Sequence, residues 1–174
     1  MPILFENETE FECPESELLS LAAYALTFMK IDDRAELSIL AVNEDEMERL
    51  HMEWMDEEGP TDVLSFPIDQ LRPGQPLAEG EGTLGDVVLC PAVAQRQAEV
   101  AAHGTIDELQ ILLVHGILHL MGFDHAEKTE EIEMFTLQTQ IISEWKRARR
   151  VLLNYCSSYC FWCLLDFWLA PRAL

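Results

Sequence analysis

The most regular hydrophobic pattern in this chain of 174 residues lies in DELQILLVHGILHLM, residues 107–121. Apolar side chains recur there every three or four positions with few polar ones between them, which is typical of a buried helix. Thr105 precedes this segment and Glu108 follows three positions later, so the two are expected to form a capping box at the start of the helix.

Shorter patterns predict the other elements. AELSILAVN, residues 35–43, alternates as a strand does. EDEMERLHMEWM, residues 44–55, has the acidic first turn of a helix, with Asn43 as its capping residue. Further strands are predicted at 2–7, 61–67 and 82–90, and further helices at 14–31, 91–104 and 127–150. Three or four strands with about five helices indicate an α+β domain, or an α/β one, with a small mixed β-sheet.

Composition supports a globular domain and constrains its partners. Apolar residues make up 49% of the chain and aromatic residues 9%, enough for a real hydrophobic core. The 32 acidic and 11 basic residues give a formal net charge of -21, so the surface repels nucleic acid at long range. This balance argues against a protein that coats RNA or DNA broadly.

The N-terminus and the cysteines indicate a cytoplasmic protein. MPILFENETEFECPE lacks the basic start and the long apolar run of a secretory signal. In the cytoplasm thiols stay reduced. The cysteines are odd in number and clustered, unlike a disulfide framework; they are Cys13, Cys90, Cys156, Cys160 and Cys163.

Three of the five histidines fall within HGILHLMGFDH, residues 115–125. His115 and His119 are four positions apart on the predicted helix, so they share a face and can share one ion. Gly122 can leave the helix in a left-handed conformation and return His125 to the same point. Three imidazole nitrogens at about 2.0–2.1 Å leave a fourth tetrahedral position for water, as in catalytic zinc sites. We therefore expect one Zn²⁺ at the end of the buried helix in a zincin-like arrangement, although imidazole also suits Ni, Cu, Co and Fe.

The histidine cluster has two alternative interpretations, a set of core residues without a metal and the zinc site of a protease. A single buried histidine is usually a hydrogen-bonded core residue, but burying three without a common partner would cost desolvation. The spacing of the histidines matches the metzincin proteases, in which a glutamate general base follows the first histidine. Gly116 occupies that position here, so peptide-bond hydrolysis by that route is not expected.

HGILHLMGFDH, taken with GPTDVLSFP and LGDVVLCP, resembles the YbeY family of bacterial rRNA-maturation endoribonucleases. The blocks stand in the family's order and cover residues from about 35 to 145. The resemblance implies a zinc-dependent, single-strand-specific endoribonuclease with His115, His119 and His125 as metal ligands. It also implies roles in 16S rRNA 3′-end maturation and ribosome quality control, with single-stranded rRNA, the small ribosomal subunit and its assembly factors as partners.

The chain departs from this family at one substrate-binding position. Many members carry an arginine shortly before the PTDVLSFP block, thought to face the substrate phosphate, and the matching residue here is Met55. Arg49 lies about one and a half helical turns upstream and would compensate only if its helix is oriented favourably. The missing arginine and the charge of -21 both bear on RNA affinity rather than on the metal site.

Carboxylates near such a site could orient a ligand histidine or accept a proton from water. Asp86 in LGDVVLC and Asp124 beside His125 are the preferred candidates, ahead of Asp62 in the TDVLSFP strand. Each also has an ordinary alternative: Asp62 as a turn or cap residue, Asp86 as a strand-end carboxylate and Asp124 as a loop residue.

The sequence divides into a catalytic-type domain, residues 1–150, and a C-terminal tail, residues 151–174. The tail is rich in cysteine and aromatic residues and follows the basic segment KRARR. Its apolar run is long enough for a membrane anchor, but Asp166 within it is costly, so membrane attachment is not favoured over a docking or non-functional tail.

Three functions remain in competition. The first is the zinc-dependent endoribonuclease acting on rRNA, and the second is a non-catalytic zinc-binding ribosome-assembly factor, which the missing arginine and the acidity favour. The third is a metalloprotease-like hydrolase, against which Gly116 counts.

Overall fold

The computed structural model describes residues 1–77 and 82–166, with side chains as far as Val151. In chain order the elements are β1 (Ile3–Asn7), α1 (Glu15–Phe28), β2 (Glu36–Ala41), α2 (Glu44–Met55), β3 (Val63–Pro67), β4 (Thr83–Leu89), α3 (Pro91–Ala101), α4 (Thr105–Leu120) and α5 (Lys128–Asp166).

The four strands form one mixed sheet in the order β1-β2-β4-β3. β1 and β2 are parallel, as are β2 and β4, whereas β3 pairs antiparallel to β4. Over the described residues, a small mixed sheet with five helices confirms the predicted α+β class.

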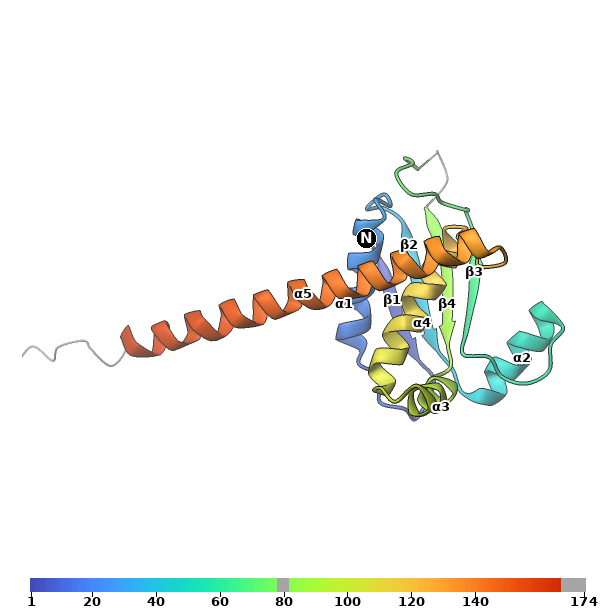
Figure 1. The fold of residues 1–174 in the computed structure, drawn as a ribbon, viewed down its shortest axis with the longest axis horizontal. Coiled ribbons are helices and arrows are strands. Elements are labelled where there is room, and N and C mark those ends of the chain that lie inside the picture. The colour runs from blue at the N-terminus through green and yellow to red at the C-terminus, as the bar shows by residue number, and fades with distance from the viewer. Residues whose placement is uncertain (78–81, 167–174) are drawn as a thin grey trace, which may run out of the picture. The chain divides into compact units, whose positions relative to one another are not determined.

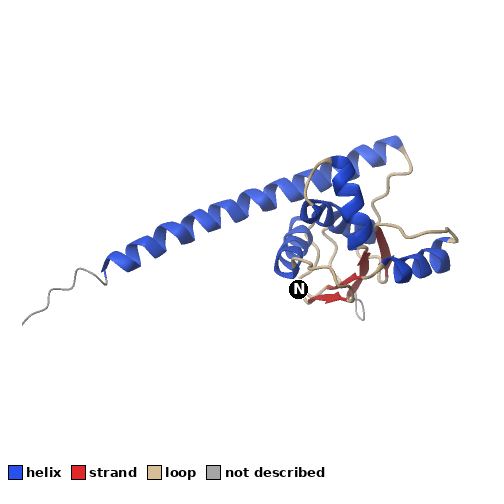
Figure 2. Ribbon diagram, turned by 90° about the horizontal axis from the view of Figure 1, so that it is seen from below, coloured by secondary structure: helices blue, strands red, loops and turns tan. Residues whose placement is uncertain are grey.

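Helices α1 and α4 pack on one face of the sheet (Figures 1 and 2). α4 is the helix expected from the apolar pattern of residues 107–121, and most of its side chains are buried. Because side chains alternate along a strand, Val63 and Val87 face α4 while their neighbours Leu64 and Val88 face the other side. There they are buried together with Met47 of α2.

The two predicted helix caps had different outcomes. Asn43 caps α2 as expected, since its side-chain oxygen accepts a hydrogen bond from the backbone N–H of Glu46 at 2.9 Å. The capping box at Thr105 was wrong, because Thr105 is already the first helical residue and Gly104 holds the cap position without a side-chain bond. Glu108 instead pairs with Nε2 of His103 at 2.8 Å.

Two compact units divide the chain, Met1–Ile142 and Ser143–Leu174, and α5 runs through the boundary. The same helix continues through residue 150, where the tail was predicted to begin, and ends at Asp166. The side chains of the three tail cysteines and residues 167–174 lie outside the described residues. Within the part of the chain that is described, no helix has the length and apolar character needed to cross a membrane.

Candidate metal centre

His115 and His119 project from the same face of α4, as their spacing predicts. Their Nε2 atoms are 3.1 Å apart. Two ligands of one tetrahedral ion, each bonded at about 2.0–2.1 Å, would be separated by about 3.3 Å. The nitrogens that His115, His119 and His125 offer all lie within 4.8 Å of one another, so the three predicted ligands converge.

The turn after α4 returns the third histidine. Gly122 has a φ of 81°, in the left-handed region, and its N–H donates to the carbonyl of His119 at 2.8 Å. The N–H of Phe123 donates to the carbonyl of Leu118 at 3.1 Å, which closes the helix end. Beyond the turn, the N–H of His125 donates to Oδ1 of Asp124 at 2.7 Å. The predicted role of Gly122 in redirecting the chain is confirmed.

Arg72 secures this turn from a distant part of the chain. Its Nη1 donates to the carbonyl oxygen of Met121, one of the free acceptors at the end of α4. A Cβ atom at Gly122 would collide with the same guanidinium, so the glycine is required for this approach as well as for its φ. A cation at a helix C-terminus is also electrostatically favourable. Sequence patterns gave no sign of this contact, because 49 positions separate the two residues.

Gln138 of α5 orients His115. Its side-chain oxygen Oε1 lies 3.2 Å from Nδ1 of His115. An amide oxygen can only accept, so Nδ1 carries the proton and the lone pair of Nε2 is left for a metal. Partners of this kind fix the tautomer and the ring orientation of a ligand histidine. Sequence reasoning missed Gln138, since nothing in the periodicity of α5 distinguishes it from other polar positions.

Burial keeps two of the imidazoles neutral. Desolvation lowers the pKa of His115, and the nearby His125 adds to this. Desolvation also lowers the pKa of His119, with further contributions from His115 and His125. A metal ion binds the neutral ring, so these shifts favour metal binding near neutral pH. Three imidazole nitrogens with one tautomer fixed are a donor set that suits zinc or another borderline divalent ion.

The histidines lie in a cleft of about 400 Å³ between α4, β3 and the segment that follows α2. Its other lining residues are Met55, Thr61, Asp62, Val63, Leu64, Ser65 and Pro67. Among these described residues there is no lysine or arginine. The cleft therefore brings metal-binding groups into contact with solvent but contains no side-chain cation for a phosphate.

Gly116 packs directly on the sheet below this cleft. A Cβ atom there would lie 2.8 Å from Cγ1 of Val87 and 3.1 Å from Oγ of Ser65. The Ser65 hydroxyl in turn donates to the carbonyl of Gly116 at 3.1 Å. The position that carries glutamate in metzincins is thus filled by close helix–sheet packing, and this chain has no room for that base.

Comparison with known proteins identifies the family. The sequence model described as endoribonuclease YbeY matches residues 4–146. This chain belongs to the YbeY family. The endoribonuclease YbeY of Acidothermus cellulolyticus is 55% identical over 157 residues, covering 87% of this chain and 95% of that protein. The endoribonuclease YbeY of Thermobifida fusca is 52% identical over 149 residues, covering 85% and 96%.

The fold is also found among solved structures. The solution structure of a Thermotoga maritima protein superposes with a TM-score of 0.56 at 28% sequence identity. The match covers 86% of this chain and 92% of that protein. The resemblance to YbeY seen in the three sequence blocks is therefore confirmed over most of the chain.

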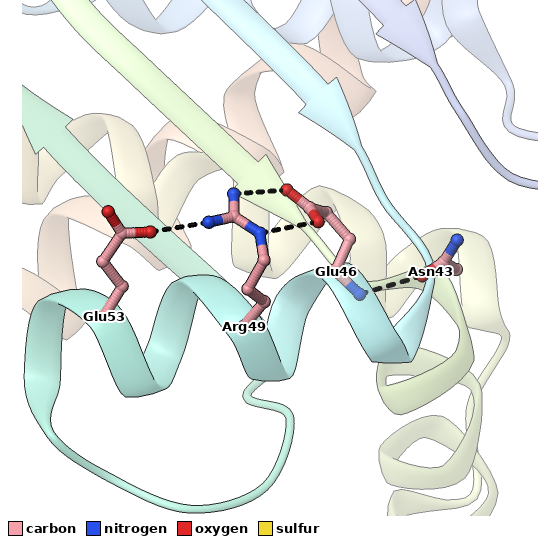
Figure 3. A network of polar contacts seen from close by, with 4 residues as sticks. All are labelled: Asn43, Glu46, Arg49 and Glu53. Carbon is pink, nitrogen blue, oxygen red and sulfur yellow. Dashed lines mark hydrogen bonds and ion pairs between the residues drawn. The ribbon is translucent and has the colours of Figure 1, made fainter.

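Arg49 does not take the place of the arginine that the resemblance led us to expect at the position of Met55. Figure 3 shows its guanidinium held between two carboxylates of its own helix. Nε and Nη2 donate to Glu46 at 2.9 and 2.7 Å, and Nη1 donates to Glu53 at 2.6 Å. Three of the five guanidinium N–H groups of Arg49 are thus engaged with carboxylates. Arg49 is not among the described residues that line the cleft, whereas Met55 is, with 58% of its surface exposed.

Of the two preferred carboxylates, Asp86 lies away from the histidines. Asp86 follows the alternation of β4, so it faces away from α4, opposite to Val87. It lines a different hollow, of about 730 Å³, with Glu46 and Trp54. Asp86 is therefore not beside the histidines, and the structure does not support its predicted part in ligand orientation or proton transfer.

Asp124 and Asp62 do lie at the histidine site. The Asp124 carboxylate opposes the lowering of the His119 pKa, although burial dominates, and its role as a proton acceptor stays a prediction. Asp62 lines the cleft, but its Oδ1 accepts from the Val63 N–H at 2.8 Å and its Oδ2 from Nε2 of Gln97 at 2.9 Å. These bonds tie the start of β3 to α3, which is the turn-residue role considered for Asp62.

Proposed function

We propose that this YbeY protein is a zinc-dependent endoribonuclease that cleaves single-stranded rRNA in the cytoplasm. Its proposed tasks are 3′-end maturation of 16S rRNA and ribosome quality control, on the small subunit and with its assembly factors. Relatives that share half of its residues are named endoribonucleases. The observation that carries the proposal is the convergence of three imidazole nitrogens in an open cleft.

Each residue of the metal centre has a proposed role. His115, His119 and His125 would hold the ion, with Gln138 keeping Nε2 of His115 available. When bound, the ion supplies Lewis-acid activation of a water molecule and a phosphoryl oxygen. The open cleft admits a flexible strand, and Asp124 is the carboxylate proposed to take the proton.

The test is cleavage of a single-stranded rRNA fragment, compared with the same fragment annealed to its complement. His115→Ala and His119→Ala should lose both metal and cleavage, while the protein as purified should contain about one zinc per chain. His103→Ala is a matched control, since this histidine lies outside the cluster and pairs with Glu108. Equal cleavage by all four proteins, with metal content measured, would exclude the endoribonuclease.

A non-catalytic, zinc-binding assembly factor is the second candidate. It is favoured by the lack of a cation among the described residues of the cleft and by the net charge of -21. Metal-loaded protein that binds the small subunit but leaves single-stranded rRNA intact would support this alternative. A protease-like function has no such support, because close packing at Gly116 leaves no place for the glutamate.

A further inference from the structure

Phe135 of α5 stands beside the histidine cluster. Its ring centroid is 6.1 Å from that of His115 and 6.1 Å from that of His125, with interplanar angles of 24° and 14°. The phenyl ring is therefore nearly parallel to two of the three ligand rings. It comes from the same helix as Gln138, so α5 contributes two side chains to the surroundings of the site.

The surroundings of Phe135 are unusual for a phenylalanine. The residue is 40% exposed, whereas its neighbour Met134 is completely buried and supplies the core contact of this turn. The preceding turn carries Glu130, Glu131 and Glu133, all exposed. With 40% of its surface in water, the Phe135 ring contributes less to folding than a fully buried ring would, and part of it is open to a ligand.

An RNA substrate must be held at the metal centre, and an aromatic ring can do this. RNA is usually held through contacts from lysine and arginine to its phosphates. No such side chain lines the described cleft, and Arg49 is engaged with carboxylates. Proteins also hold single strands by stacking bases on aromatic side chains, which needs no positive charge.

We propose that Phe135 is a stacking platform for one unpaired base of the RNA substrate, next to the bond cleaved at the metal centre. This assignment rests on the proposed endoribonuclease function and names a determinant of its specificity. A base in a duplex already has neighbours on both faces, so only an unpaired nucleotide can offer a free face to the phenyl ring. Single-strand preference then follows from one side chain beside the histidines, whose cleft contributes little electrostatic attraction.

The test uses metal-loaded, full-length protein and single-stranded oligoribonucleotides that carry 2-aminopurine at one position, moved along the strand in a series. Stacking quenches the fluorescence of this base, so a platform at Phe135 should quench it at one position of the series. Phe135→Ala should abolish that quenching and weaken binding roughly 5- to 100-fold. Phe135→Tyr and Phe135→Trp should keep both, because each retains an aromatic face.

Two controls separate stacking from other roles. Phe135→Leu keeps apolar bulk beside the imidazoles but has no aromatic face, so it should retain metal and still lose the quenching. Val100→Ala removes an equally apolar, 90% exposed side chain from α3 and should change neither quenching nor binding. Quenching that persists in Phe135→Ala overturns the proposal. Normal RNA binding by Phe135→Leu also overturns it, because apolar bulk that shields the imidazoles would then be sufficient.

The outcomes also distinguish this inference from the proposed function. If wild-type protein quenches 2-aminopurine, Phe135→Ala does not, and neither cleaves RNA, the stacking platform is supported and the nuclease is excluded. Protein that cleaves single strands equally well with and without the Phe135 ring supports the nuclease and overturns the platform.

Discussion

At the scale of single residues, the glycine that interrupts the metzincin motif has a packing role. Gly116→Ala should destabilise the protein by about 1–3 kcal/mol, the usual cost of forcing an extra methyl into a packed core. The new Cβ would lie 2.8 Å from Val87, a β-branched side chain with little freedom to move.

Urea denaturation measures this effect. Gly82→Ala is the matched control, because a Cβ there has nothing within 4 Å, and it should leave the free energy of unfolding nearly unchanged. Equal stability of the two variants would show that the helix and the sheet can move apart at Gly116 to accept a methyl group.

Gln138 supplies the second prediction for a single side chain. Gln138→Ala removes the acceptor that holds Nδ1 of His115, and metal affinity should fall roughly 10- to 100-fold. Titration with a competing chelator gives the dissociation constant directly. Thr136→Ala is a suitable control on the same helix, since its hydroxyl donates to the carbonyl of Ile132 and, among the described residues, makes no bond to a histidine of the cluster. Unchanged affinity in Gln138→Ala would mean that ring orientation is set by packing alone.

At the scale of elements, local patterns predicted much more than long-range contacts. The apolar spacing of residues 107–121 predicted α4, and the i, i+4 spacing with Gly122 predicted which histidines converge. Alternation in β4 also contains the information that Asp86 and Val87 face opposite ways, but not which of them faces α4. That choice depends on how the helices cover the sheet, which is a tertiary property.

The contacts made by Arg72 and Gln138 could not be predicted for a similar reason. Each joins segments that are distant in sequence, and a lone arginine in a Pro- and Gly-rich loop has no periodicity to interpret. The capping box at Thr105 failed because Gly104 has the extended conformation of a cap, with ψ of 146°, so the helix begins at Thr105, one residue earlier than a cap at Thr105 requires.

The loop that carries Arg72 is expected to stabilise the metal centre through the end of α4. Arg72→Ala removes a charged donor from the Met121 carbonyl, a bond worth about 1–2 kcal/mol at a partly exposed site. Because that bond stabilises the turn before His125, both the melting temperature and the metal affinity should fall. Differential scanning calorimetry and chelator competition measure the two effects.

Arg34→Ala is the control for this variant. It removes an arginine that is exposed like Arg72 and whose ion-pair partner among the described residues is its neighbour Asp32, far along the chain from the histidines. Both arginine variants lose one positive charge, so a loss of metal affinity limited to Arg72→Ala would indicate the turn rather than net charge. Equal behaviour of the two variants would contradict the role of Arg72.

At the scale of the whole molecule, the charge of -21 opposes the approach of an anionic substrate. Five of the eleven basic residues follow residue 142, so the unit Met1–Ile142, which contains the histidines, is more acidic than the chain as a whole. Nucleases that rely on cationic grooves lose affinity as salt is added. A protein that repels RNA at long range and holds it by short-range contacts should behave differently.

We therefore expect kcat/KM on a short single-stranded RNA to rise, or stay level, as salt increases from about 10 to about 150 mM. Over that range the screening length shortens from about 30 to about 8 Å, which removes repulsion between the acidic surface and the RNA but leaves contact distances unaffected. The value of kcat at saturating RNA is the internal control, because it does not include the encounter step and should change little. A steep fall of kcat/KM with salt would instead require several phosphate–cation contacts, and would count against binding by stacking and metal coordination alone.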